Sequence, residues 1–104
     1  MPELTCTARR IGDYESRTEE YELTFAAGGA EPRSLNIKYQ AARAYEINAA
    51  LDSSAETARA VLTDAYEPEV ARRPTEEALA QLAWKTLQSA KYEEGAPQRR
   101  VLEI

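Results

Sequence analysis

The residues that could carry chemistry are few, because the chain contains no histidine and a single cysteine, Cys6. Histidine is the commonest general base and the commonest metal ligand, and the sequence has no spaced carboxylate loop of the calcium type. The glycine pair at 28–29 lacks the further glycine, lysine and serine or threonine of a phosphate-binding loop. We therefore expect no catalytic residue, no metal site and no cofactor.

Cys6 is the one thiol that could act as a nucleophile, provided that a neighbour such as Arg9 lowered its pKa. It lies on the apolar side of an alternating segment from Leu4 to Ala8. We expect a buried and unreactive cysteine instead. Neighbouring carboxylates such as Glu76 and Glu77 do not face each other on a helix, so we interpret them as solvated surface.

The most suggestive local feature is a group of carboxylates between residues 13 and 22. Four of them are expected to point outward from a hairpin, whereas Glu19 has inward parity; the four are Asp13, Glu15, Glu20 and Glu22. A rigid ribbon with outward carboxylates presents a negative strip that could meet a basic surface on another protein and steer its association. The alternative is an ordinary solvated edge whose charges discourage aggregation.

Trp84 is the second candidate for contact with a partner. It lies beside, and not on, the apolar stripe of its predicted helix, so we expect its ring at the boundary of the core. Together with Tyr45, Tyr66 and Tyr92 it could form a partly exposed aromatic patch, since such residues are enriched at binding hot spots. The alternative is that the ring only completes the core from its rim.

The first element that positions these residues is a predicted β-hairpin over residues 4–26, where apolar and polar residues alternate on both sides of a turn that begins at Gly12. The apolar sides must share a face, which restricts the register. The expected register pairs Cys6 with Leu23, Leu4 with Phe25, and Arg9 with Glu20.

Three helices are predicted between the hairpin and the last strand. Residues 35–51 are ambiguous, because they alternate like a strand at first yet also form a helical stripe; their length and alanine content favour a helix. A capping box at Ser53 and Glu56 begins the next helix, which Pro68 ends. Thr75 caps the third, predicted to be the longest, over residues 75–93.

The tail from residue 99 to residue 104 alternates as a closing strand. The predicted fold class is therefore α+β, in the order strand, strand, helix, helix, helix, strand, with one domain over residues 1–104. An antiparallel sheet, made of the N-terminal hairpin and the C-terminal strand, is expected to pack against two to three helices.

Composition narrows the function classes. The net charge is −5, and three arginine pairs are scattered along the chain without forming a stripe, so direct binding of nucleic acid is disfavoured. The chain has no signal-like start and no apolar run near the roughly 20 residues of a membrane span, so we expect a cytoplasmic protein with no membrane role.

These observations favour a non-enzymatic, acidic protein-interaction module. We expect an inhibitor or regulator that occupies the basic surface of a nucleic-acid-handling protein, as a mobile element or an anti-defence system would use. The alternative is a small structural or accessory subunit, such as a homodimer formed through a free sheet edge or through the aromatic patch. A third possibility is an enzyme that works with carboxylates, tyrosine and arginine alone.

Overall fold

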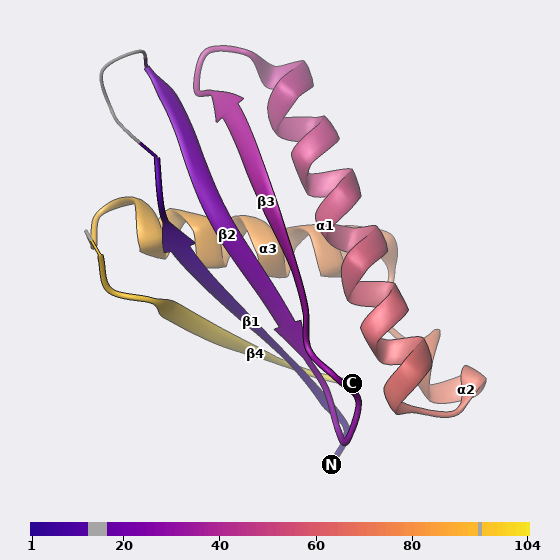
Figure 1. Ribbon diagram of the computed structural model, residues 1–104. Helices are drawn as coiled ribbons and strands as arrows, with labels where there is room; N and C mark the ends of the chain where they lie inside the picture. Colours follow the sequence, from indigo (N-terminus) through magenta and orange to yellow (C-terminus); the bar gives the residue numbers. More distant parts are fainter. Residues whose placement is uncertain (13–16, 94) are drawn as a thin grey trace.

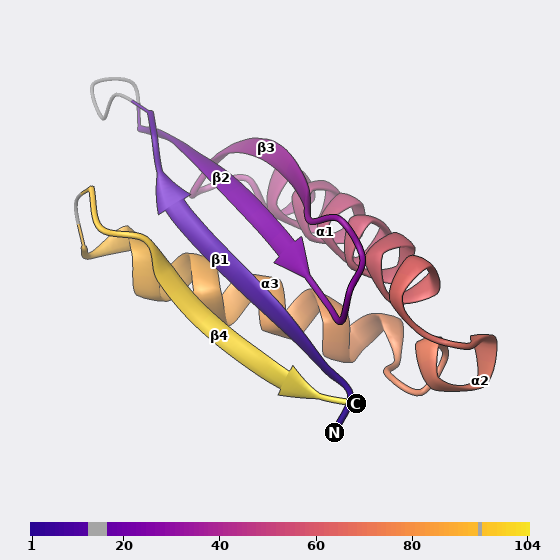
Figure 2. The same ribbon diagram turned by 60° about the horizontal axis from the view of Figure 1, so that its bottom comes forward.

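The computed structural model describes residues 1–12, 17–93 and 95–104. Within them, an antiparallel sheet has the order β3-β2-β1-β4 and consists of β1 (Glu3–Arg10), β2 (Thr18–Ala26), β3 (Arg33–Gln40) and β4 (Gln98–Glu103). Helices α1 (Ala44–Ala65) and α3 (Glu76–Lys91) pack on one face, and the short α2 (Pro68–Ala71) connects them (Figures 1 and 2). The predicted α+β class is confirmed, with the C-terminal strand beside β1.

The hairpin of β1 and β2 forms with the predicted faces but with a different register. Cys6 lies opposite Phe25, and Leu23 lies opposite Ala8, so the expected pairing of Cys6 with Leu23 is wrong by two residues. No residue between Gly12 and the start of β2 indicates from the sequence how many residues the turn takes up, and this number determines the register. A shift of two keeps every side chain on its predicted face, which is why Cys6, Leu23 and Phe25 are all buried.

The helix predicted over residues 35–51 is wrong in its first part, because β3 runs to Gln40 and pairs with β2. Ile37 and Tyr39 are buried, whereas the alternate residues Asn36 and Lys38 are exposed. This is the period of a strand. The long-range pairing with β2 overrides the helical propensity of the segment, and the helix begins only at Ala44.

Helix α1 is continuous through the predicted capping box. It has 22 residues against 16 for α3, so the prediction that the helix over residues 75–93 is the longest is wrong among the described residues. Ser53 therefore lies inside a helix and does not begin one. Its neighbour Ser54 is fully buried and donates a hydrogen bond to the Ala50 carbonyl at 2.8 Å. This back-bonding satisfies the hydroxyl in the core, so a serine pair here does not interrupt the helix.

Helix α3 begins where the sequence predicts. The Thr75 side chain accepts a hydrogen bond from the Ala78 N–H at 3.0 Å, which caps the N-terminus. The predicted apolar stripe faces the sheet, and Leu79, Leu82 and Leu87 are buried. The core therefore lies between this stripe, the apolar side of α1 and the inner face of the sheet.

Candidate functional site

The predicted acidic strip lies partly on the outer face of the sheet. Asp13 and Glu15 fall outside the described residues. Glu22 places Oε1 3.4 Å from Nη2 of Arg9, and Glu20 lies opposite Lys38 of β3 in the register. Glu22 therefore has an ion-pair partner on an adjacent strand, whereas Glu20 has a lysine opposite it in the register but makes no ion pair with a described residue.

Trp84 lies at the boundary of the core, as expected. Its ring is half-buried and packs against the buried ring of Tyr39, with 6.4 Å between the two ring centroids. The predicted aromatic patch is not assembled, because Tyr45 and Tyr66 lie at opposite ends of α1, roughly 30 Å apart for a helix of this length. The Tyr66 hydroxyl instead donates to the backbone carbonyl of Glu3 at 3.1 Å.

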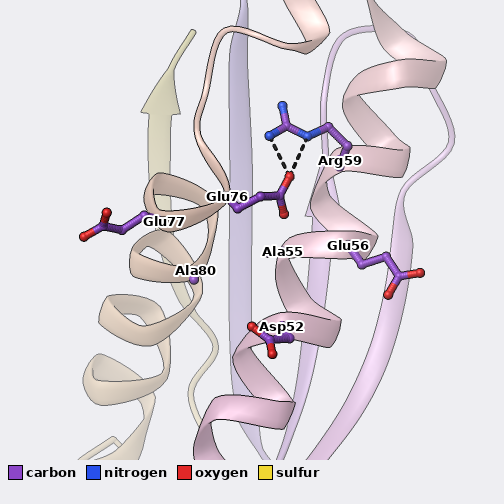
Figure 3. Close-up of a pocket in the computed structure, with 7 residues that line it drawn as sticks. All are labelled: Asp52, Ala55, Glu56, Arg59, Glu76, Glu77 and Ala80. Atoms are coloured by element: carbon purple, nitrogen blue, oxygen red, sulfur yellow. Dashed lines mark hydrogen bonds and ion pairs between the residues drawn. The ribbon is translucent and has the colours of Figure 1, made fainter.

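A different acidic surface forms between α1 and α3. The two helices border a depression of about 480 Å³, and its lining carries four carboxylates and one cation. We call this surface the helix groove; its residues are Asp52, Ala55, Glu56, Arg59, Glu76, Glu77 and Ala80 (Figure 3). Ala55 and Ala80, whose side chains are small, lie among its lining residues.

Arg59 holds the two walls of the helix groove together. Its guanidinium lies 2.9 Å from Oε1 of Glu76 and donates to the carbonyls of Ala71 and Pro74 at 2.7 and 2.6 Å. These bonds fasten α1 to the start of α3. The single cation of the helix groove is thus already bound by Glu76 and by the backbone.

Three carboxylates of the helix groove have no cationic partner among the residues that the structure describes. Asp52, Glu56 and Glu77 are exposed and make no ion pair with another described residue. Figure 3 shows Asp52 beside the space between the helices, whereas Glu56 and Glu77 project from the outer sides of α1 and α3. They line a rim and do not converge on one point, which suits contact with an extended basic surface better than the binding of one ion.

The helix groove was not predicted from the sequence: Glu76 and Glu77 were interpreted as solvated surface, and Glu56 as part of a capping box. Its only local signal is the i, i+4 spacing of Asp52 and Glu56, which puts both on one side of a helix. Glu76 follows twenty residues later, so the packing of α1 against α3 brings the two pairs together. No group of three potential metal ligands gathers anywhere in the described parts of the chain.

Cys6 is buried, as predicted. Burial raises the pKa of its thiol to about 12. A hydrogen bond with Thr86 lowers this pKa, but its effect is smaller than that of burial. Because the thiolate is the reactive form, such a thiol is a poor nucleophile at neutral pH.

Glu19 is the buried carboxylate that the strand parity predicts, and it is 6% exposed. Its Oε1 accepts a hydrogen bond from the Tyr21 hydroxyl at 2.9 Å and lies 3.8 Å from Nη1 of Arg10 and 3.9 Å from Nζ of Lys91. Burial, followed by the Glu19 charge, raises the pKa of the adjacent Tyr39 to about 12. This cluster joins β1 and β2 to the end of α3.

Comparison with known proteins gives no match to a family model, to a curated protein or to a solved structure. Among the described residues, no helix is both long and apolar enough to cross a bilayer.

Proposed function

We propose that the chain is a non-enzymatic interaction module that binds a basic surface of a partner protein through the helix groove. The observation that supports this proposal is that three carboxylates on the rim of one depression, Asp52, Glu56 and Glu77, make no ion pair with a described residue. A basic, nucleic-acid-binding surface has the complementary charge. Occupying such a surface would make the chain an inhibitor or regulator of a nucleic-acid-handling protein.

The helix groove is suited to this role because it is rigid before binding. The two helices share a core with the sheet, and Arg59 ties α1 to Glu76 and to the loop before α3. A surface that is already ordered loses little conformational entropy when a partner docks. The charges are therefore held in a fixed pattern.

The carboxylates of the helix groove act mainly through their combined field. An exposed ion pair contributes only about 0–1 kcal/mol, but several like charges on one rigid surface raise the rate of encounter with an oppositely charged partner. Salt screens this attraction, with a Debye length of about 8 Å near physiological ionic strength. We expect binding that is fast at low salt and slower at high salt.

The test is affinity capture from host lysate with two variants of equal charge. The groove variant carries Asp52→Asn, Glu56→Gln and Glu77→Gln; Glu76 stays, because it holds Arg59. The control variant carries Glu31→Gln, Glu67→Gln and Glu69→Gln, three exposed carboxylates away from the helix groove. Both change the net charge from −5 to −2.

We expect the parent and the control variant to capture the same basic protein at low salt, and the groove variant to lose it. Loss in both variants would show that only net charge matters. Capture by all three would place the contact elsewhere, with Glu20, Glu22 and Trp84 as the next residues to replace.

A second function, an accessory subunit that forms a homodimer, is favoured by the edge of the sheet. Strand β4 pairs with β1 on one side only and exposes 44% of Val101. An unpaired edge can add a strand from a second copy. Light scattering gives the molar mass of the chain in solution. A dimer that the substitution Val101→Lys dissociates would support the subunit function, and a parent chain that stays monomeric at high concentration would exclude it.

A further inference from the structure

A second depression lies where the ends of several elements meet, and its charge is opposite to that of the chain. It has a volume of about 400 Å³ and lies near the end of β1, the start of β2, the turn after β3 and the last residue of α3. We call it the basic pocket; its residues are Arg10, Arg17, Glu19, Gln40, Ala41, Ala42 and Lys91. Three cations and one carboxylate give it a formal excess of two positive charges, in a chain with a net charge of −5.

One of the three cations is engaged by the protein itself. Nη1 of Arg10 lies 3.8 Å from Glu19 and donates to the backbone carbonyl of Lys91 at 3.4 Å. Both side chains of the Arg10–Glu19 pair are about nine-tenths buried, with 10% and 8% exposed. Lys91 lies almost as close to the same carboxylate, at 3.9 Å, so Glu19 offsets one positive charge that Arg10 and Lys91 share, and two of the three positive charges have no carboxylate among the pocket residues.

The remaining cations keep donors for another acceptor. Nζ of Lys91 lies 3.9 Å from Oε1 of Glu19 and 5.8 Å from the centre of the Tyr92 ring, and the first distance is longer than the roughly 2.7–2.9 Å of a charge-assisted hydrogen bond. Neither Lys91 nor Arg17 donates a side-chain hydrogen bond to any residue in the described part of the chain. Lys91 is also one-third exposed, so a molecule from solvent can reach it.

The backbone at Arg17 adds a second, independent observation. Its φ is 60°, and it is the one residue other than glycine in the described chain with a positive φ. This conformation costs an arginine of order 1 kcal/mol, which a glycine would not incur. Glycine adopts this conformation without strain, so Arg17→Gly removes the side chain at no cost in backbone strain.

We propose that the basic pocket binds a small oxyanion, a phosphate or carboxylate group carried on a short apolar body. Arg17 and Lys91 supply the charge, because guanidinium and ammonium groups are the usual partners of these oxyanions. The methyl groups of Ala41 and Ala42 supply an apolar wall for the body, and the Gln40 amide can donate a further hydrogen bond. This site lies apart from the helix groove, with which it shares no residue.

The test is thermal unfolding of the full chain at constant ionic strength with phenyl phosphate, benzoate or inorganic phosphate replacing chloride. A ligand of the folded state raises the melting temperature with its concentration. We expect phenyl phosphate or benzoate to raise it well above the value in chloride, and more than inorganic phosphate does. An equal rise of the melting temperature with phenyl phosphate and with inorganic phosphate would contradict the role of Ala41 and Ala42 as an apolar wall.

Two variants test the residues. Arg17→Gly suits the positive φ and should remain folded, and Lys91→Met keeps an apolar side chain while removing the charge and its contact with Glu19. Each should weaken binding of the preferred probe about tenfold, the effect of losing one hydrogen bond to a charged group. The matched control is Lys85→Met, an exposed lysine of the same helix outside the basic pocket. Unchanged binding in both Arg17→Gly and Lys91→Met, or equal loss in the control, would refute the site.

Discussion

Replacing Glu19 by glutamine should destabilise the fold far more than the same change at Glu22 on the same strand. Glu19 is buried beside Arg10 and Lys91, whereas Glu22 pairs with Arg9 at the surface, with 40% and 49% of the two side chains exposed. The nitrogen–oxygen distance is 3.8 Å in the Arg10–Glu19 pair and 3.4 Å in the Arg9–Glu22 pair. The comparison therefore isolates the effect of burial.

The expected loss of stability depends on whether the charge that loses its partner is buried or exposed. Removing one partner of a buried ion pair costs about 3–5 kcal/mol, because the other charge stays out of water. Glutamine still offers an oxygen to the Tyr21 hydroxyl, so we take the lower end for Glu19→Gln, about 3 kcal/mol. Glu22→Gln should cost about 0–1 kcal/mol, as exposed pairs do.

Urea denaturation at pH 7 gives both values, and calorimetry gives the melting temperatures. With roughly 4–8 °C for each kcal/mol in a domain of this size, Glu19→Gln should melt at least about 12 °C below the parent. A loss of stability no larger than that of Glu22→Gln would refute the assignment of Glu19 as the buried counter-charge of Arg10.

Four further outcomes are expected. Leu82→Ala should lower the free energy of unfolding by about 2–5 kcal/mol in denaturant, because Leu82 is 7% exposed; no change would place it outside the core. Thr75→Ala should cost about 1 kcal/mol through loss of the N-cap, and an unaltered melting temperature would contradict that role. Cys6 and Tyr39 have folded-state pKa values raised to about 12, so the unfolded chain loses their protons first. Stability should therefore fall as the pH rises from about 9 to 12, and Cys6 should react with a thiol reagent only after unfolding; rapid labelling of the folded chain would disprove its burial.

Local patterns predicted the faces of the hairpin but not its register. The alternation around Tyr21, Leu23 and Phe25 decides which side chains point inward, because a strand has a period of two. The register depends also on the length of the connection, which no residue between Gly12 and β2 determines.

Elements that depend on distant partners were predicted less well. Ile37 and Tyr39 belong to a strand only because β2 lies beside them, and a helix is the better local interpretation of that segment. Ser53 looks like a cap because hydroxyls favour helix ends, but α1 passes through it. Thr75 was predicted correctly because its cap is made within one turn of the chain.

The candidate site was the hardest part to predict for the same reason. Asp52 and Glu77 lie on different helices, and only their packing places both on one rim. The predicted strip contained Glu22, whose charge Arg9 of another strand offsets, and Glu20, which lies opposite Lys38 in the register. Sequence alone gives the charges but not their neighbours in space.

The most direct test of the helix groove as the binding surface is the association rate of the captured partner as a function of salt. The parent and the control variant, with Glu31, Glu67 and Glu69 replaced, should associate fast at low salt, and both rates should fall steeply as salt is added. The groove variant, with Asp52, Glu56 and Glu77 replaced, should associate slowly and with little dependence on salt. A groove variant that associates as fast as the control at every salt concentration would contradict the account.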